Sequence, residues 1–359
     1  MSIGYRAVQW SRSKRVYDLI AAGAAASFIV VFIAVGKAAW RGEHAVSDEV
    51  LFLRATGACA LALLHVVLCI GPLARFDSRF LPVLFNRRHL GVLTFLVALA
   101  HGVVAIGYYH GFGSANPLLS LLTSNTNFGS LGAFPFQLLG AGGLLILFLL
   151  AATSHDFWLK NLSARVWKSL HMLVYAAYAM LVGHVALGAM QTDRGVLLPA
   201  LVIGGAAIVC GLHIAAGLRE SARDRAAARA RGDDGEEWFD VGPAMEIPLD
   251  RARTVCTPRG DRIAVFRHDG GVSAVTNRCA HQGGPLGEGA VIDGCITCPW
   301  HGWQYRAHDG CAPPPFAEKI ATYQVRIVAG RAQVSSRALP PGSPVPPARI
   351  EEHADVRAD

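Results

Sequence analysis

The stretch Asn277–Tyr305 reads NRCAHQGGPLGEGAVIDGCITCPWHGWQY and decides how the C-terminal part of the chain folds. It contains the motif Cys279-Ala280-His281 and, sixteen residues further on, the motif Cys298-Pro299-Trp300-His301. Glycines follow both motifs and let two loops approach each other closely. Two sulfur and two nitrogen donors on two loops therefore predict a metal centre where the loops meet.

Two kinds of centre use this donor set. Tetrahedral zinc takes Cys and His ligands, but zinc sites usually pair C-x-x-C with H-x-x-x-H. A Rieske [2Fe–2S] cluster needs two thiolates on one iron and two imidazoles on the other, so one Cys and one His in each loop favour it. The stretch resembles the Rieske ferredoxins and the Rieske domains of ring-hydroxylating oxygenases. That resemblance implies that the cluster ligands are Cys279, His281, Cys298 and His301.

The motif departs from the high-potential Rieske proteins of respiratory complexes. Those proteins have an extra Cys in each loop, joined as a disulfide, and the equivalent positions here are Gly284 and Trp300. A Ser that donates a hydrogen bond to their cluster is Trp303 here, whereas Tyr305 is kept. Fewer hydrogen bonds stabilise the reduced cluster less, so we expect a potential of roughly −150 mV, the low end of the Rieske range.

The region around the motif has the pattern of a small all-β domain, residues 238–338. Short runs such as 263–266 and 272–275 are rich in β-branched residues and alternate with Gly, Pro and Asp turns. A charged linker, residues 219–237, precedes the domain, and its first half is expected to continue a helix. The Pro-rich, charged tail, residues 339–359, is predicted to be disordered.

Cysteine usage does not indicate structural disulfides. Three cysteines lie in apolar runs, the other five lie in the β domain, and none lies in a predicted outer loop. Cys295 precedes Cys298 by three residues and could mimic a C-x-x-C redox pair. We interpret it instead as an inert thiol in a β turn.

The rest of the chain has the composition of a membrane protein. Of 359 residues, 52% are hydrophobic and 16% are charged, against roughly 25% charged residues in soluble proteins. The net charge of +7 does not indicate nucleic-acid binding, because the basic residues flank apolar runs instead of forming one patch. Six runs are long enough to span a bilayer: 16–40, 50–73, 90–109, 134–153, 166–190 and 196–218. We therefore expect a six-helix all-α transmembrane bundle, residues 16–218, followed by the β domain.

Basic residues alternate between the loops of this bundle. They are frequent in the N-terminus, residues 1–15, and after the second, fourth and sixth runs, and scarce in the other loops. The positive-inside rule then places both termini in the cytoplasm. The first run is too long for a signal peptide and lacks a cleavage site. We expect a multi-pass protein of the cell inner membrane.

Five histidines lie within or at the edges of the second, third and fifth runs: His65, His89, His101, His171 and His184. Such residues are rare in membrane spans and functional by default. Along a helix, His89 and His101 are ~18 Å apart, and His171 and His184 are ~20 Å apart. Because the third and fifth spans run in the same direction, His89 is expected at the same depth in the bilayer as His171, and His101 at the same depth as His184. Two b-type haems could each lie between two imidazoles.

Helix geometry complicates this arrangement. At roughly 100° per residue, His89 is turned about 120° from the face of His101, and His171 about 140° from that of His184. A bend or a π-bulge would be needed to direct both levels to one partner helix. The pair His101 and His184 lies deepest in the bilayer, whereas His89 could be an interfacial residue. His65 is interpreted as a structural residue or as a neighbour of a quinone.

The membrane half also resembles a known family. Arg87-Arg88-His89-Leu90-Gly91, followed by His101, resembles the third span of the ferric-reductase-like transmembrane family. Residues 151–184 resemble its fourth and fifth spans. The resemblance covers roughly residues 50–215 and implies one or two b haems on the third and fifth spans, with electron transfer across the membrane. The family includes ferric reductases, NADPH oxidases and the haem subunit of a bacterial methionine-sulfoxide reductase system.

Flavin- and NADPH-binding domains of such reductases have no counterpart here, because no Gly-rich dinucleotide fingerprint follows a strand. We expect an oxidoreductase component that receives single electrons from a cytoplasmic reductase or ferredoxin. Electrons would pass through the Rieske cluster to b-type haem and an acceptor at the outer face. The alternative is a quinol- or oxygenase-linked partner whose Rieske domain exchanges electrons with a cytoplasmic enzyme. A redox sensor without turnover is a third hypothesis.

Overall fold

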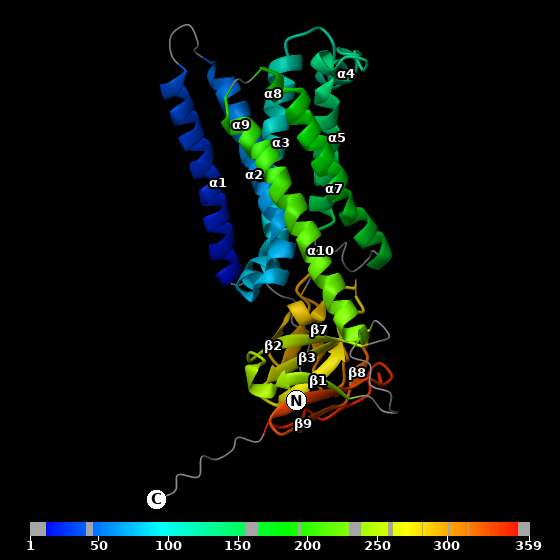
Figure 1. Ribbon diagram of the computed structural model, residues 1–359. Coiled ribbons are helices and arrows are strands. Elements are labelled where there is room, and N and C mark those ends of the chain that lie inside the picture. The colour runs from blue at the N-terminus through cyan, green and yellow to red at the C-terminus, as the bar shows by residue number, and fades with distance from the viewer. Residues whose placement is uncertain are drawn as a thin grey trace, which may run out of the picture. The chain divides into compact units, whose positions relative to one another are not determined.

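The computed structural model describes residues 12–40, 46–154, 164–192, 195–229, 238–257, 261–281, 283–300, 302–314 and 316–350. The chain forms two compact units. One holds Trp10–Leu73 and Asn86–Ile214, and the other holds Ala74–Phe85 and the chain from Ala215 onward. As expected, a helical region comes first and a small all-β domain follows (Figure 1).

The helices cover the apolar runs. Their bounds are α1 (Arg12–Ala39), α2 (Asp48–Phe76), α3 (Leu81–His110), α4 (Pro117–Thr123), α5 (Phe136–Ala152), α7 (Ala164–Leu187), α8 (Ala189–Thr192), α9 (Leu197–Pro199) and α10 (Gly205–Arg229). At the start of α2, the Ser47 hydroxyl accepts the N–H of Val50, and two acidic residues occupy the first turn. Helix α10 runs to Arg229, so the first half of the expected linker is helical.

The expected count of six spanning helices needs a correction. Within the described residues, five helices are long and apolar enough to cross a membrane: Lys14–Ala39, Asp48–Phe76, Asn86–His110, Ser169–Thr192 and Leu197–Ala222. The fourth apolar run forms α5, which has 17 residues and is therefore only about 26 Å long. Pro135 precedes α5 and has no N–H to extend the hydrogen-bond ladder.

The sixth run is not a regular α-helix. After α9, residues Ala200–Gly204 form a π-helical turn, and α10 begins at Gly205. Pro199 ends α9 and supplies no N–H, which is a common cause of such irregularity. The turn lies near the start of the apolar segment Leu197–Ala222.

Four helices share the main buried cluster of the helical unit. Leu64 and Leu68 of α2, Leu147 of α5, Tyr178 of α7 and Val209 of α10 all contribute to it. Small residues allow the closest approach: Ala177 is fully buried, and a Cβ at Gly143 of α5 would lie 2.8 Å from the side chain of Leu181. The Gly-rich segment of α5 therefore lets this helix pack closely against α7.

The β domain consists of three small sheets. Their strand orders are β1-β10-β9, β2-β3-β4-β8 and β5-β6-β7. The strands are β1 (Trp238–Pro243), β2 (Arg251–Cys256), β3 (Arg262–His268), β4 (Gly271–Thr276), β5 (Ala290–Ile292), β6 (Cys295–Thr297), β7 (Gln304–Arg306), β8 (Thr322–Tyr323), β9 (Val325–Val328) and β10 (Arg331–Ser335). Two buried clusters fill the domain, and one of them contains Cys279, Cys298 and Tyr305.

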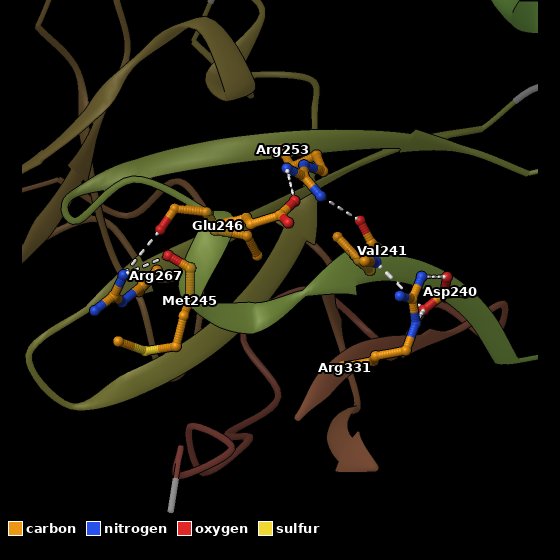
Figure 2. A network of polar contacts seen from close by, with 9 residues as sticks. Asp240, Val241, Met245, Glu246, Arg253, Arg267 and Arg331 are labelled. Carbon is orange, nitrogen blue, oxygen red and sulfur yellow. Dashed lines mark hydrogen bonds and ion pairs between the residues drawn. The ribbon is translucent and has the colours of Figure 1, made fainter. Parts of the chain in front are cut away.

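Arginine side chains connect the first sheet to the second (Figure 2). Arg253 of β2 donates to the carbonyl of Val241 at 2.9 Å and pairs with Glu246. Arg267 of β3 donates to the carbonyl of Met245 at 2.9 Å. These hydrogen bonds satisfy backbone carbonyls in β1 and in the turn after it, and they hold the first sheet against the second.

The prediction of a disordered tail from residue 339 is wrong for the described part of that tail. Ala348 and Val272 exchange two backbone hydrogen bonds of 2.8 Å, and Val345 donates to the carbonyl of His308. Ile350 packs against one of the buried clusters. A Pro-rich segment without an apolar pattern cannot form a core by itself, but in an extended conformation it can bind to the core of the β domain. Residues 351–359 lie outside the described residues.

Candidate cofactor sites

The two Cys-His loops of the β domain have the same backbone design. The first follows β4, and the second follows β6. Gly283 donates its N–H to the carbonyl of Cys279 at 2.8 Å, and Gly302 donates to that of Cys298 at 2.9 Å. Both glycines have positive φ, +73° and +70°, which disfavours residues with a Cβ. Each loop therefore folds back after its Cys, and the two cysteines occupy the same position in two similar turns.

Tyr305 connects the strand after the second loop to the first loop. Its hydroxyl accepts the N–H groups of Ala280 at 2.9 Å and His281 at 3.3 Å, and it lies 3.3 Å from Cys279 Sγ. Tyr305 is fully buried. Burial, reinforced by Cys279, raises the pKa of Tyr305 above its usual range, so the hydroxyl stays protonated and can donate to the sulfur.

Aromatic packing covers the other predicted ligand of the first loop. The indole of Trp303 stacks on the His281 imidazole with ring centres 4.1 Å apart and planes 3° from parallel. Phe316 packs against Trp303 with ring centres 4.3 Å apart. Gly284 lies where the loops meet, and a Cβ there would be 2.7 Å from Cys298 Sγ. At the position equivalent to a disulfide Cys of the high-potential Rieske proteins, this chain thus has a glycine that the close contact requires.

A zinc ion and a [2Fe–2S] cluster need different arrangements of the four predicted ligands. A mononuclear zinc site would need Cys279, His281 and Cys298 to converge on one ion together with a fourth ligand. Three of the four predicted ligands, Cys279, His281 and Cys298, lie within the described residues. A [2Fe–2S] cluster needs only two protein ligands at each iron. The fourth predicted ligand, His301, lies outside the described residues.

Cys295, the other thiol of the possible C-x-x-C pair, lies in β6 and not in a turn. It is buried, and its backbone pairs with Ile292 and Arg306. Burial is the main cause that raises the pKa of the Cys295 thiol. A neutral, inaccessible thiol is a poor nucleophile.

In the helical unit, the structure brings His101 of α3 and His184 of α7 together. Their ring centres are 6.3 Å apart, and their planes are nearly perpendicular, at 81°. His101 Nδ1 lies 3.0 Å from the carbonyl oxygen of Leu53, and His184 Nδ1 lies 2.9 Å from that of Phe136. A carbonyl can only accept, so each Nδ1 carries the proton and each Nε2 is the nitrogen with a lone pair.

This pair fits a haem iron. A metal–imidazole bond is about 2 Å long, so two imidazoles on opposite sides of one ion have ring centres about 6 Å apart. Glycines make room for both rings: a Cβ at Gly57 would lie 3.1 Å from His101, and a Cβ at Gly140 would lie 2.7 Å from His184. Ligating histidines commonly donate their other N–H to a carbonyl or a carboxylate. The donor set, its orientation and the backbone around it therefore suit a b-type haem.

The structure does not bring the two inner histidines into ring contact with each other. His171 stacks on Trp167 with ring centres 3.7 Å apart, and its Nδ1 lies 3.1 Å from the Trp167 carbonyl oxygen. His89 Nδ1 lies 2.9 and 3.0 Å from the two carboxylate oxygens of Asp18 on α1. Both rings thus direct Nδ1 to an oxygen, as the outer pair does.

Sequence reasoning missed several residues that shape these sites. Gly57 and Gly140 could not be distinguished from other helix glycines. Asp18 did carry a signal, because an acidic residue inside an apolar run is rare in membrane helices. His65 bonds Tyr178 across the buried cluster, with Nε2 and the hydroxyl 3.0 Å apart. This contact agrees with the structural interpretation of His65.

Comparison with known proteins covers both parts of the chain. Residues 56–182 match the ferric reductase like transmembrane component, and residues 237–324 match the Rieske [2Fe-2S] domain. The chain is 33% identical over 102 residues to the anthranilate 1,2-dioxygenase ferredoxin subunit of Burkholderia cepacia, which covers 28% of this chain and 92% of that protein.

Other relatives match the β domain over a smaller share of their length. Cholesterol 7-desaturase nvd 1 of Ciona intestinalis is 32% identical over 88 residues, 24% of this chain and 18% of that protein. The chain thus spans less than a fifth of this desaturase. A solved structure, a putative NADH-dependent nitrite reductase small subunit from Mycobacterium tuberculosis, has 25% identity and a TM-score of 0.27, and covers 30% of this chain and 100% of that one.

Proposed function

Because the chain belongs to the Rieske [2Fe–2S] proteins and joins that domain to a ferric-reductase-like transmembrane component, we propose that it carries single electrons across a membrane. Electrons enter from a cytoplasmic reductase or ferredoxin at the Rieske cluster, continue to b-type haem, and leave to an acceptor at the outer face. The protein lies in the cell inner membrane with both termini in the cytoplasm.

The observation that supports this proposal best is the pair His101 and His184. Two imidazoles of different helices have the separation that one iron needs, and carbonyls hold both in the tautomer that ligates through Nε2. When bound there, a haem supplies reversible one-electron chemistry. The residues of the chain hold, orient and desolvate it. His101 and His184 would hold the haem through their Nε2 atoms, and the bound haem would serve electron transfer.

In the β domain, Cys279, His281, Cys298 and His301 are the cluster ligands. Tyr305 donates to one ligand sulfur, and Trp303 shields one ligand imidazole from water. The domain is related over most of its length to a protein named as the ferredoxin subunit of a dioxygenase. That name supports a carrier of single electrons without an NAD(P)H or flavin site of its own.

The test uses the full chain in proteoliposomes, with ferricyanide trapped inside and the Rieske domain outside. Addition of a reduced ferredoxin should bleach the internal ferricyanide at one electron per molecule. Cys298→Ser and His184→Ala should each abolish the bleaching. Matched controls are Cys311→Ser in the same β domain and His213→Ala in the same helical unit, and both should retain it.

The alternative function makes a different prediction in the same vesicles. Several relatives of the β domain are named as oxygenases or desaturases, so the domain could instead serve a cytoplasmic enzyme while quinol feeds the membrane half. In that case a quinol would reduce the haem in Cys298→Ser, and ferredoxin would not reduce the trapped ferricyanide in the unmodified chain. That pair of results would refute outward transport.

A further inference from the structure

The segment between α3 and α5, residues 111–135, exposes apolar side chains. Figure 1 shows α4, the helix of this segment, at one end of the helical unit. The residues that are more than half exposed include Phe112, Leu118, Leu119, Leu122, Phe128 and Leu131. Large apolar side chains gathered in this way mark a surface that binds a protein or a membrane. The segment therefore calls for a partner.

Helix α4 has its apolar side turned away from the protein. Leu118, Leu119 and Leu122 share one side of the helix, because they are one and four positions apart. The opposite side carries Ser120, whose hydroxyl lies 2.9 Å from Nδ1 of the buried His110 at the end of α3. A helix between protein and water has the reverse arrangement, with its apolar side toward the protein. The arrangement of α4 instead suits apolar surroundings.

The segment also lacks charged residues. No Asp, Glu, Lys or Arg occurs from Gly111 to Ser154. The two other segments that are expected on the same side of the membrane do carry charges: Arg41, Glu43, Asp48 and Glu49 in one, and Asp193 and Arg194 in the other. A partner that binds through its charge therefore finds no complementary group on residues 111–135.

Side chains within the segment satisfy part of its backbone. Asn116 Oδ1 accepts the N–H of Leu118 at 2.9 Å, which caps α4. Asn125 Nδ2 donates to the carbonyl of Ala133 at 3.0 Å. Backbone groups that are paired within the protein can leave water, whereas unpaired groups are costly in lipid. These bonds thus allow the segment to lie against a bilayer.

The exposed surface of the segment continues that of the membrane helices. Val103 and Tyr109 of α3 and Leu145 of α5 are also more than half exposed. Helix α3 contains Asn86–His110, which is long and apolar enough to cross a membrane. A bilayer that covers α3 up to His110 reaches the start of the segment. The lipid that surrounds α3 is therefore the partner nearest to α4.

We propose that residues 111–135 form an interfacial element, with Leu118, Leu119 and Leu122 inserted into one leaflet of the bilayer. The partner is the uncharged acyl region of the lipid, because the leucine side is apolar and continues the lipid-facing surface of α3. Amphipathic helices at membrane surfaces bury their apolar side by roughly 5–10 Å. The polar run 123–127 lies toward water. The inference needs only that α3 crosses a membrane, so it stands whatever the direction of electron transfer.

The first test labels cysteines in the full chain, reconstituted in phosphatidylcholine nanodiscs that leave both membrane faces open to solvent. Leu119→Cys places a thiol on the leucine side, and Thr126→Cys is the matched control in the polar run; both positions are exposed. A water-soluble maleimide should modify Leu119→Cys about tenfold more slowly, because the thiolate is the reactive form and apolar surroundings disfavour it. Mass spectrometry of the labelled peptides distinguishes them from those of the native cysteines.

The second test uses the unmodified chain in the same nanodiscs. A phosphatidylcholine with a photoactivated diazirine in its acyl chain should label the peptide of α4, residues 117–123, and spare residues 124–127. Addition of anionic phosphatidylglycerol should not change this labelling, because the segment has no charged residue.

Two results would overturn the inference. Equal maleimide rates at Leu119→Cys and Thr126→Cys would place the leucine side in water. Slow modification of Leu119→Cys without diazirine labelling of α4 would mean that protein covers the helix, and chemical cross-linking would then show whether that protein is a second copy of this chain.

Discussion

At the scale of single residues, hydrogen bonds fix the orientation of the predicted ligands. The Tyr305 hydroxyl lies 3.3 Å from the sulfur of Cys279, a predicted cluster ligand, and also accepts two backbone N–H groups of the same loop. The outer histidines bond to the carbonyls of Leu53 and Phe136. In each case a second group fixes the orientation of a ligand, and this usually matters for affinity nearly as much as the ligand itself.

Removal of the Tyr305 hydroxyl should therefore weaken the domain and change the cluster. We expect Tyr305→Phe to destabilise the β domain by about 1–3 kcal/mol, because buried N–H groups lose their acceptor, and to lower the cluster potential. Tyr323→Phe removes a hydroxyl from the other buried cluster of the domain and should leave the potential unchanged. Thermal loss of the cluster absorbance and redox titration measure the two effects. An unchanged potential in Tyr305→Phe would mean that its hydroxyl does not donate to the sulfur.

At the scale of elements, the irregular helix of the sixth apolar run fits around a buried side chain of α2. A Cβ at Gly205, the first residue of α10, would overlap the His65 imidazole. The same imidazole bonds Tyr178 of α7. One histidine of α2 thus contacts both α7 and α10, directly after the π-helical turn. The turn and the glycine together provide the notch that His65 needs.

Gly205→Ala should consequently disturb the helical unit, whereas its neighbour should tolerate the same change. We expect Gly205→Ala to cost about 1–3 kcal/mol by overpacking, with earlier loss of the haem absorbance on heating in detergent. A Cβ at Gly204 would meet nothing within 4 Å, so Gly204→Ala should be neutral or slightly stabilising. Equal stability of the two variants would show that His65 does not occupy this notch.

At the scale of the whole molecule, two compact units contain separate ligand sets. The predicted cluster ligands lie in the unit with the β domain, and the predicted haem ligands His101 and His184 lie in the helical unit. Every candidate ligand set is complete within its own unit. The two cofactors should therefore assemble independently.

Cys298→Ser should abolish the Rieske EPR signal and leave the Soret absorbance of the haem intact. The unmodified protein should contain about two irons per chain beyond the haem iron, with acid-labile sulfide. Cys311→Ser should behave like the unmodified protein. Loss of haem from well-folded Cys298→Ser would contradict independent assembly, and stoichiometric zinc without labile sulfide would contradict the cluster.

Much of this molecule could be predicted from local sequence. The class of fold follows from the length of the apolar runs and from the short β-rich runs around the Cys-His motifs. The types of donor and their spacing already favoured a Rieske cluster over zinc. The spacing of the histidines along the third and fifth apolar runs followed from the helix rise alone. Each of these inferences depends only on residues that are close together along the chain.

Other features depended on atoms that only the fold brings together. Sequence could match His101 and His184 in depth, but not the carbonyls of Leu53 and Phe136 or the notches at Gly57 and Gly140. The hydrogen bond between His89 and Asp18 and the pairing of Ala348 with Val272 could not be predicted for the same reason. Periodicity and composition describe one segment at a time. A contact between distant segments depends on how their surfaces fit, and that is decided only when the whole chain packs.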